Sequence, residues 1–270
     1  KKEGIKVLFY VAPQLWAWAP WRIRKLRKCC DKLACILPFE QEWFSSRGVD
    51  TTFIGNPMLD ELPFEIPGNE RDYSEFDANN AKIALLPGSR QAEIDTLWKP
   101  MQRIALELVE RYPGIKFEVP AVSGQKLEIL KKTQVVDVDF EYITGNAPGV
   151  CRESALAIIA CGSVALQVAA AGCPMVVMYQ SSRLVWHTIG RWLINTKFYC
   201  LVNIMAGREI VPEFMPYFTS IDPIFAKVCN FLDNKSKLAE INSELLNLVK
   251  SFAGTDASSS VGGITLKMTE

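Results

Sequence analysis

An apolar run that breaks abruptly at Gly88 constrains the fold more than any other stretch of this sequence. Residues 83–87, IALLP, are apolar without alternation, which is typical of a strand buried on both faces of a parallel sheet. Gly88 permits a sharp turn, and Ser89 can cap a helix whose first turn carries Arg90 and Glu93. Such a corner directs backbone N–H groups at whatever lies above the sheet, and an arginine there can hold a phosphate. The alternative is an ordinary turn between strand and helix, with a solvated arginine.

A second corner of the same kind follows at residues 160–163, Ala-Cys-Gly-Ser. It lies between a very apolar strand at 155–160 and a helix at 164–171 that stops at Gly172. In a parallel sheet both corners open on the carboxyl edge of the strands, where open α/β sheets bind ligands. The pair therefore predicts a nucleotide-phosphate site. The polar, glycine-containing loop at 203–209 is a third candidate wall of that site.

The pattern between the two corners and beyond them is that of a doubly wound parallel sheet. Strands and helices alternate, which favours βαβ units over an antiparallel arrangement. We expect strands at 116–119, 140–143, 175–179 and 198–202, and helices at 96–112, 125–133, 146–152, 186–194, 222–232 and 236–252.

A smaller set of elements precedes the first corner. Strands are expected at 5–11, 33–37 and 51–54, with a helix at 40–47. A doubly buried strand that arrives with almost nothing before it predicts that this first half is incomplete. We expect five segments: 1–62 as the remainder of a first half, 63–80 as a linker, 81–218 as a second half, 219–252 as C-terminal helices, and 253–270 as a disordered tail.

An aromatic and basic segment lies in the first half. Tryptophans crowd a proline-flanked loop and basic residues load the helix that follows it: Trp16, Trp18, Trp21, Arg22, Arg24, Lys25, Arg27 and Lys28. One interpretation is a surface for a phosphate or an anionic membrane. The other is a solvated helix whose tryptophans are core anchors.

Composition excludes several classes of function. Lys+Arg and Asp+Glu both total 30, so no overall basic charge points to nucleic acid. There are eight cysteines without a C-x-x-C pair, and His187 is the only histidine, which argues against disulfide frameworks and zinc sites and fits a cytosolic chain. No apolar run approaches the roughly 18 residues of a membrane span.

Six motifs occur in one order along the chain: YVAPQLWAWAPWR, ILPFE, FIGNPMLDE, LLPGSRQAEI, CGSVALQVAAAGCPMVVMY and LVNIMAGREIVPE. Together they resemble the lipid-A-disaccharide synthase family over roughly Gly4 to Phe218. The resemblance implies an α/β fold of two Rossmann-like halves (GT-B-like), the first half incomplete.

The resemblance also implies an activity. The family joins UDP-2,3-diacylglucosamine to 2,3-diacylglucosamine 1-phosphate, giving the β(1→6) lipid A disaccharide 1-phosphate and UDP at the cytoplasmic face of the inner membrane. That scheme requires no cofactor and no metal. It implies the two diacylglucosamine substrates and an anionic membrane surface as partners, with no nucleic acid, and it leaves a homodimer open.

By position, the resemblance assigns residues to two parts of the site. The donor side would be formed by Ser89, Arg90, Glu93, Gly162, Ser163, Gln167, Asn203, Arg208 and Glu209. The acceptor and membrane side would be formed by Trp16, Trp18, Arg22, Arg24, Lys25 and Arg27.

This chain departs from the family pattern in two ways. The family's N-terminal Gly-rich loop and the segment with its proposed catalytic aspartate are absent from the sequence, so no general base is assigned. Gln167 stands where the family usually has Glu. Two alternatives stay open: another UDP-sugar GT-B enzyme, such as a cell-wall transferase or a sugar-nucleotide 2-epimerase, or a catalytically incomplete module that binds UDP or membrane.

Overall fold

The computed structural model describes residues 4–190, 192, 194 and 196–269, and the chain divides into two compact units. Unit 1 comprises Lys1–Leu62, His187–Lys197 and Ser251–Glu270. Unit 2 comprises Pro63–Trp186 and Phe198–Lys250. In the described part of the chain, no helix has the length and hydropathy needed to cross a bilayer.

Unit 1 is built on a three-stranded parallel sheet in the order β1-β2-β3. The strands are β1 (Leu8–Tyr10), β2 (Lys32–Cys35) and β3 (Thr51–Phe53). Their helices are α1 (Ile23–Cys29), α2 (Pro38–Ser45), α3 (Pro57–Asp60) and α13 (Ala257–Thr269), with a 3₁₀ turn at Pro20–Arg22.

The central strand β2 is buried on both faces of the sheet, and its successive side chains pack into different clusters. The expectation of a doubly buried strand at 5–11 is wrong, because β1 lies at the edge of the sheet with Phe9 and Tyr10 exposed. Leu33 packs in one core cluster with Leu26 of α1 and Phe44 of α2. Ala34 belongs to a second cluster with Ile54 and Ala257, against which Val261 and Ile264 of α13 also pack. The sheet is therefore completed by a helix from the far end of the sequence.

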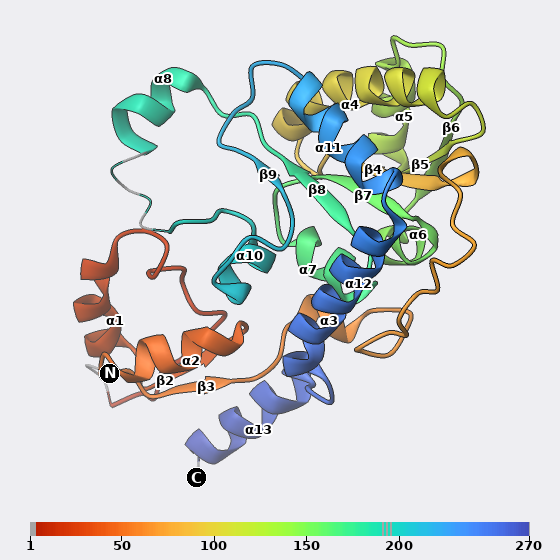
Figure 1. Cartoon of the computed structure of the whole chain (residues 1–270). Coiled ribbons are helices and arrows are strands. Elements are labelled where there is room, and N and C mark those ends of the chain that lie inside the picture. Colours follow the sequence, from red (N-terminus) through yellow and green to blue (C-terminus); the bar gives the residue numbers. More distant parts are fainter. Residues whose placement is uncertain (1–3, 191, 193, 195, 270) are drawn as a thin grey trace. The chain divides into compact units, whose positions relative to one another are not determined.

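Unit 2 contains a six-stranded sheet in the order β6-β5-β4-β7-β8-β9, every neighbouring pair being parallel (Figure 1). The chain builds outward from β4 to β6, then returns to the other side of β4 and builds outward again. The strands are β4 (Lys82–Leu86), β5 (Lys116–Ala121), β6 (Phe140–Thr144), β7 (Leu156–Ala160), β8 (Met175–Met178) and β9 (Glu213–Phe214). The doubly wound parallel sheet is confirmed.

Helices connect these strands. They are α4 (Gln91–Arg111), α5 (Gly124–Lys132), α6 (Ala147–Glu153), α7 (Val164–Ala170), α8 (Arg183–Val185), α10 (Leu201–Ala206), α11 (Asp222–Leu232) and α12 (Lys235–Val249), with 3₁₀ turns at Ala78–Asn80 and Lys250–Phe252 and a π turn at Trp186–Gly190. Helix α7 packs against α6, α10 and α12, and α4 packs against α11. The expected helix at 186–194 includes residues 191 and 193, which lie outside the described residues.

Two expectations for secondary structure are wrong. The expected strand at 198–202 is replaced by helix α10, because the Glu213 carboxylate accepts the N–H groups of Tyr199 and Cys200 and so caps the start of a helix. The strand that pairs with β8 is β9. The tail expected to be disordered forms α13 over 257–269, because Val261 and Ile264 lie on one helical face and pack against unit 1.

The segment expected to link two domains is fixed to unit 2. Arg71 donates to the carbonyls of Ser154, Cys151 (Nη2···O 2.7 Å) and Ala171 (Nη2···O 3.2 Å). Its backbone N–H donates to Asn242 of α12 at 3.1 Å. Residues 63–77 therefore form a strap along unit 2.

Candidate functional site

The two sequence-predicted corners lie next to each other at the carboxyl edge of the larger sheet. Strands β4 and β7 are neighbours, with Leu86 opposite Ile159. The strand order reverses between them, and a crevice at such a switch point is where open α/β sheets bind ligands. The corner that follows β4 and the corner that follows β7 therefore lie side by side at this edge.

The first corner turns at Gly88, whose φ of +110° favours glycine. A side chain there would also collide with the Glu93 carboxylate. Glu93 Oε2 accepts hydrogen bonds from the backbone N–H groups of Ser89 (3.0 Å) and Arg90 (3.1 Å). The two amides expected to face a phosphate are thus held by an internal carboxylate.

Arg90 is nevertheless available to a ligand. Its side chain is 82% exposed, and one guanidinium nitrogen pairs with Glu93 Oε1 at 3.0 Å. The pair leaves most of the guanidinium fork directed to solvent, where it can contact an anion. Ser89 is exposed beside it.

The second corner is open. Gly162 and Ser163 are exposed, and a side-chain carbon added at Gly162 would meet no atom within 4 Å. The Ser163 hydroxyl makes no capping hydrogen bond to α7, so it can serve a ligand. Gln167 lies one turn further along α7 and is half-buried.

Cys161 lies at the same corner but is not a nucleophile. Burial raises the pKa of its thiol to about 12, and the negative charges of Glu213 and Glu93 add to the shift. The thiol therefore stays protonated at neutral pH.

In the third candidate wall, at residues 203–209, Asn203 has a structural role. Asn203 is fully buried in α10; its Nδ2 donates to the Val211 carbonyl and to Glu213, both at 2.7 Å. Its Oδ1 accepts from Ile210 (2.7 Å) and Val211 (3.0 Å), so the amide is used within the protein.

The other two residues of that wall are exposed. Arg208 pairs with Glu244 of α12 at 3.0 Å, and Glu209 lies next to it at the surface. The structure therefore leaves Glu209 and part of the Arg208 guanidinium accessible, whereas Asn203 is not.

Sequence reasoning missed Glu213. This half-buried carboxylate of β9 accepts from the backbone of Tyr199 (2.9 Å) and Cys200 (3.0 Å) and from Asn203. Burial raises its pKa above the ordinary 4.5, and the hydrogen bonds from Tyr199, Asn203 and Cys200 oppose that shift. The available signal was an acid that directly follows the apolar pair Val-Pro.

The aromatic and basic segment lies in unit 1 and divides into two kinds of residue. Trp16 is half-buried, donates to Glu40 Oε1 at 2.8 Å and packs edge-to-face on Phe39. Trp18 and Trp21 are 44% and 63% exposed, and the Arg22 guanidinium lies 5.4 Å from the Trp18 ring centre.

Helix α1 presents the basic part of this segment. It buries only Leu26, and its charged residues are exposed together with the preceding arginine: Arg22, Arg24, Lys25, Arg27 and Lys28.

Among the residues that the structure describes, no group of three His, Cys, Asp or Glu side chains is arranged to hold a metal ion.

Comparison with known proteins places this architecture. The profile of the family described as lipid-A-disaccharide synthetase matches residues 1–264. The lipid-A-disaccharide synthase of Geobacter sulfurreducens is 32% identical over 272 aligned residues, which cover 99% of this chain and 70% of the relative. That of Psychromonas ingrahamii is 32% identical over 92% of this chain and 64% of the relative. The chain thus spans about two thirds of the length of these two relatives.

Solved structures share the fold at low sequence identity. A UDP-GlcNAc 2-epimerase from Neisseria meningitidis, bound to UDP-GlcNAc, has a TM-score of 0.57 at 15% identity and covers 98% of this chain and 71% of its own. Staphylococcus aureus MnaA with UDP has a TM-score of 0.56 at 13% identity, over 92% and 64%. These likenesses support the assignment of two Rossmann-like halves.

Proposed function

The chain belongs to the lipid-A-disaccharide synthase family, and from this premise we propose that it acts as a glycosyltransferase of lipid A biosynthesis. The reaction joins UDP-2,3-diacylglucosamine to 2,3-diacylglucosamine 1-phosphate and releases UDP. The observation that carries the proposal, beside the family, is the pair of adjoining corners at the switch point between β4 and β7. The epimerase likeness indicates the fold and does not argue for a second activity.

The donor corners suit the leaving group of this reaction. When an acceptor hydroxyl displaces UDP from the anomeric carbon, negative charge develops on the diphosphate. We assign the Arg90 guanidinium and the Ser163 hydroxyl to that charge, because both are exposed at the crevice. The open space above Gly162 gives the diphosphate room to approach the backbone.

Glu93 and Asn203 then act indirectly. Glu93 holds the first corner in its turn through Ser89 and Arg90, and Asn203 holds α10 against β9. Gln167 is proposed to face the ribose. Arg208 and Glu209 stay candidates for the outer rim of the donor site.

We propose that unit 1 binds the acceptor and contacts the membrane surface. Two exposed tryptophans next to an exposed basic helix are suited to the headgroup region of an anionic bilayer. Both substrates carry acyl chains, so peripheral binding at the cytoplasmic face of the inner membrane would bring the chain to them.

Arg90→Ala tests the assignment of the donor site. The activity itself is measured by formation of disaccharide and an equal amount of UDP from the two substrates in mixed micelles. The variant should bind UDP about tenfold more weakly and uridine equally well, because only UDP carries the diphosphate. Calorimetric titration of both ligands measures this difference.

Arg103→Ala is the matched control, since Arg103 is an exposed arginine further along the same helix. It should leave both affinities unchanged. Equal losses for UDP and uridine in Arg90→Ala would assign Arg90 to the fold and not to the phosphates. UDP binding without disaccharide would favour the non-catalytic module.

A further inference from the structure

A cavity of about 190 Å³ lies in unit 2, away from the two corners. Its wall includes Ala170 and Ala171, at the C-terminus of α7. Helix α7 begins after the carboxyl end of β7 and ends before the amino end of β8. The cavity is therefore at the amino edge of the sheet, and the proposed donor site is at the carboxyl edge.

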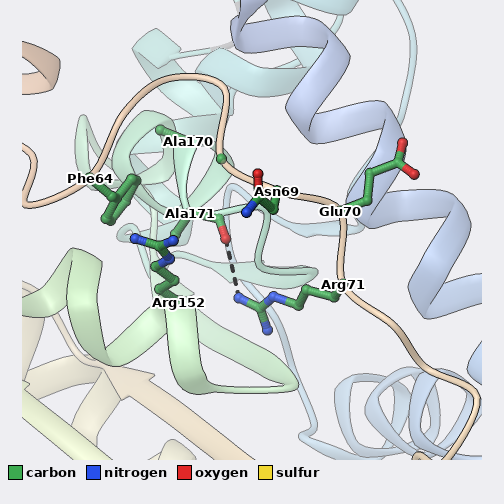
Figure 2. Close-up of a pocket in the computed structure, with 8 residues that line it drawn as sticks. Phe64, Asn69, Glu70, Arg71, Arg152, Ala170 and Ala171 are labelled. Carbon is green, nitrogen blue, oxygen red and sulfur yellow. Dashed lines mark hydrogen bonds between the residues drawn. The ribbon is translucent and has the colours of Figure 1, made fainter.

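Two arginines, Arg71 and Arg152, line this cavity, and they differ in their hydrogen bonding (Figure 2). Arg71 is fully engaged in the fold: its guanidinium holds the carbonyls of Cys151, Ser154 and Ala171. These carbonyls terminate α6 and α7, so Arg71 already neutralises the negative ends of both helices.

Arg152, by contrast, is not used to hold the fold in this way. In the part of the chain that the structure describes, its guanidinium makes no hydrogen bond and no ion pair, and it lies 5.0 Å from the ring centre of Phe64. This cation–π contact keeps the guanidinium of the exposed Arg152 next to Phe64. Its N–H groups can donate to two oxygen atoms of one anion.

The remaining polar groups of the cavity are compatible with an anion. Asn69 also lines the cavity, and in the view of Figure 2 it lies between Arg152 and Glu70. Glu70 also lines the cavity, but its carboxylate points away from the two arginines and accepts from Ser243 at 3.0 Å. The charge that faces the cavity is therefore positive.

We propose that this cavity is a second anion site, which binds a small oxyanion group through the Arg152 guanidinium and the Asn69 amide. The volume is below the roughly 300–1,000 Å³ of pockets for drug-sized ligands, so the bound group is a phosphate or carboxylate and not a whole nucleotide. The site is separate from the proposed donor site and does not depend on it.

The test is a titration followed by NMR of the ¹⁵N-labelled chain, with inorganic phosphate and with acetate at constant ionic strength. The amides of Gly68 and Asn69 report on the cavity, and those of Gly162 and Ser163 report on the donor corner. We expect saturable shifts at Gly68 and Asn69. Saturation by phosphate alone identifies a phosphate ligand, by acetate alone a carboxylate, and by both a general oxyanion site.

Arg152→Gln should weaken the response at Gly68 by about tenfold, and Arg152→Lys should weaken it less, because lysine keeps the charge without the fork. The exposed Arg103 gives the matched control, Arg103→Gln, which should leave the response unchanged. Unshifted Gly162 and Ser163 resonances in the ligand-free variants show that the fold is intact. Shifts that never saturate, or that survive in Arg152→Gln, would overturn the proposal and leave Arg152 as a helix-end cation.

Discussion

At the scale of single residues, Glu93 determines how the first corner can meet a phosphate. Its carboxylate accepts the N–H groups of Ser89 and Arg90 and pairs with the Arg90 side chain. A diphosphate that approaches this corner must compete with that carboxylate for the same donors. At the second corner the Ser163 hydroxyl makes no capping hydrogen bond and, among the described residues, donates none to a carboxylate. We therefore expect the diphosphate to be held mainly there and by the outer face of Arg90.

Gln167 offers a residue-scale prediction about the sugar. Glutamine can accept from one ribose hydroxyl and donate to the other, but neutral hydrogen bonds contribute about 0.5–1.5 kcal/mol against about 1.5–3 kcal/mol for charged ones. We expect Gln167→Glu to tighten UDP binding modestly. We expect Gln167→Ala to weaken UDP more than 2′-deoxy-UDP, as measured by calorimetry.

The exposed Gln125 supplies a control, since Gln125→Ala on α5 should change neither affinity. A Gln167→Ala variant that keeps the full preference for ribose over deoxyribose would show that this side chain does not touch the sugar.

At the scale of elements, helix α10 depends on one carboxylate from a neighbouring strand. Glu213 of β9 caps the start of α10 and holds Asn203, and β9 in turn extends the sheet beside β8. The wall of the crevice next to β8 is thus a helix fixed from its buried side. Its rigidity rests on an acid whose burial disfavours the charged form.

That burial predicts a pH dependence. Because the pKa of Glu213 in the folded chain lies above the ordinary 4.5, the folded state binds its proton more tightly than the unfolded state. The free energy of unfolding should therefore fall as pH rises from about 4.5 through the raised pKa. Glu213→Gln should show a smaller fall than the wild type, measured by urea unfolding between pH 4 and pH 8.

Burial also raises the pKa of Glu40, so Glu40 lowers the free energy of unfolding in the same direction as pH rises. The pH dependence of the Glu213→Gln variant should therefore be smaller than that of the wild type but not zero. Glu141→Gln, at an exposed position of β6, should keep the wild-type slope. If Glu213→Gln also keeps the wild-type pH dependence, the pKa of Glu213 does not differ between the folded and unfolded states.

Helix α1 carries the element-scale prediction for the membrane. Changing Arg22, Arg24, Lys25 and Arg27 to Gln should strongly reduce sedimentation with anionic vesicles, because each basic residue near such a surface contributes about 1 kcal/mol. Binding of the wild type should weaken as salt is raised. The acidic-lipid dependence is checked with neutral vesicles.

The matched control changes Lys126, Lys131 and Lys132 of α5 to Gln, a basic stretch of similar size without neighbouring exposed tryptophans. Vesicle binding that survives neutralisation of α1 would leave this helix as an ordinary solvated surface.

Elements with strong local signals could be predicted from the sequence, and elements fixed by distant contacts could not. The apolar runs at β4 and β7 and their Gly-Ser corners determine strand, turn and helix locally. By contrast, β9 has only two residues, and the residues of α10 carry an apolar run that suits strand or helix equally. Only the Glu213 carboxylate, which lies beyond α10 in sequence, decides between them.

The candidate site shows the same limit. Sequence spacing brings the two corners to one edge, since parallel topology alone requires it. The capture of the Ser89 and Arg90 amides by Glu93 depends on one side-chain conformation. The burial of Asn203 depends on the packing of α10, so neither could be read from the chain.

At the scale of the whole molecule, unit 1 is assembled from three separate stretches of sequence. Its sheet comes from the first stretch, and one face of that sheet is covered by α13 from the last. Phe252 also packs on Phe53, with ring centres 5.7 Å apart, and Asp60 accepts from the backbone of Ala257 at 2.9 Å. The stability of unit 1 therefore depends on residues more than 200 positions from its strands, as with Ala34 and Ala257.

Ile264→Asp tests that dependence. A charge at this half-buried position should loosen α13 from Ile54 and Ala34, so amides of β2 should exchange with deuterium at least about tenfold faster, a loss of roughly 1.4 kcal/mol or more. Amides of β4 and β7 should be unaffected, since they belong to unit 2. Thr265→Asp, at the exposed neighbouring position, should change neither.

The packing of α13 on the sheet of unit 1 affects how the protein folds during its synthesis on the ribosome. Domains usually fold in the order in which they are synthesised, but here the strands of unit 1 must wait for a helix that is synthesised after all of unit 2. Until residues 257–264 leave the exit tunnel, Ala34 and Ile54 lie on an uncovered apolar face. The later unit can complete its own sheet meanwhile, since it ends at Lys250. Chaperones should therefore bind the sheet of unit 1 in nascent chains, and this sheet should become resistant to a protease only after unit 2 does.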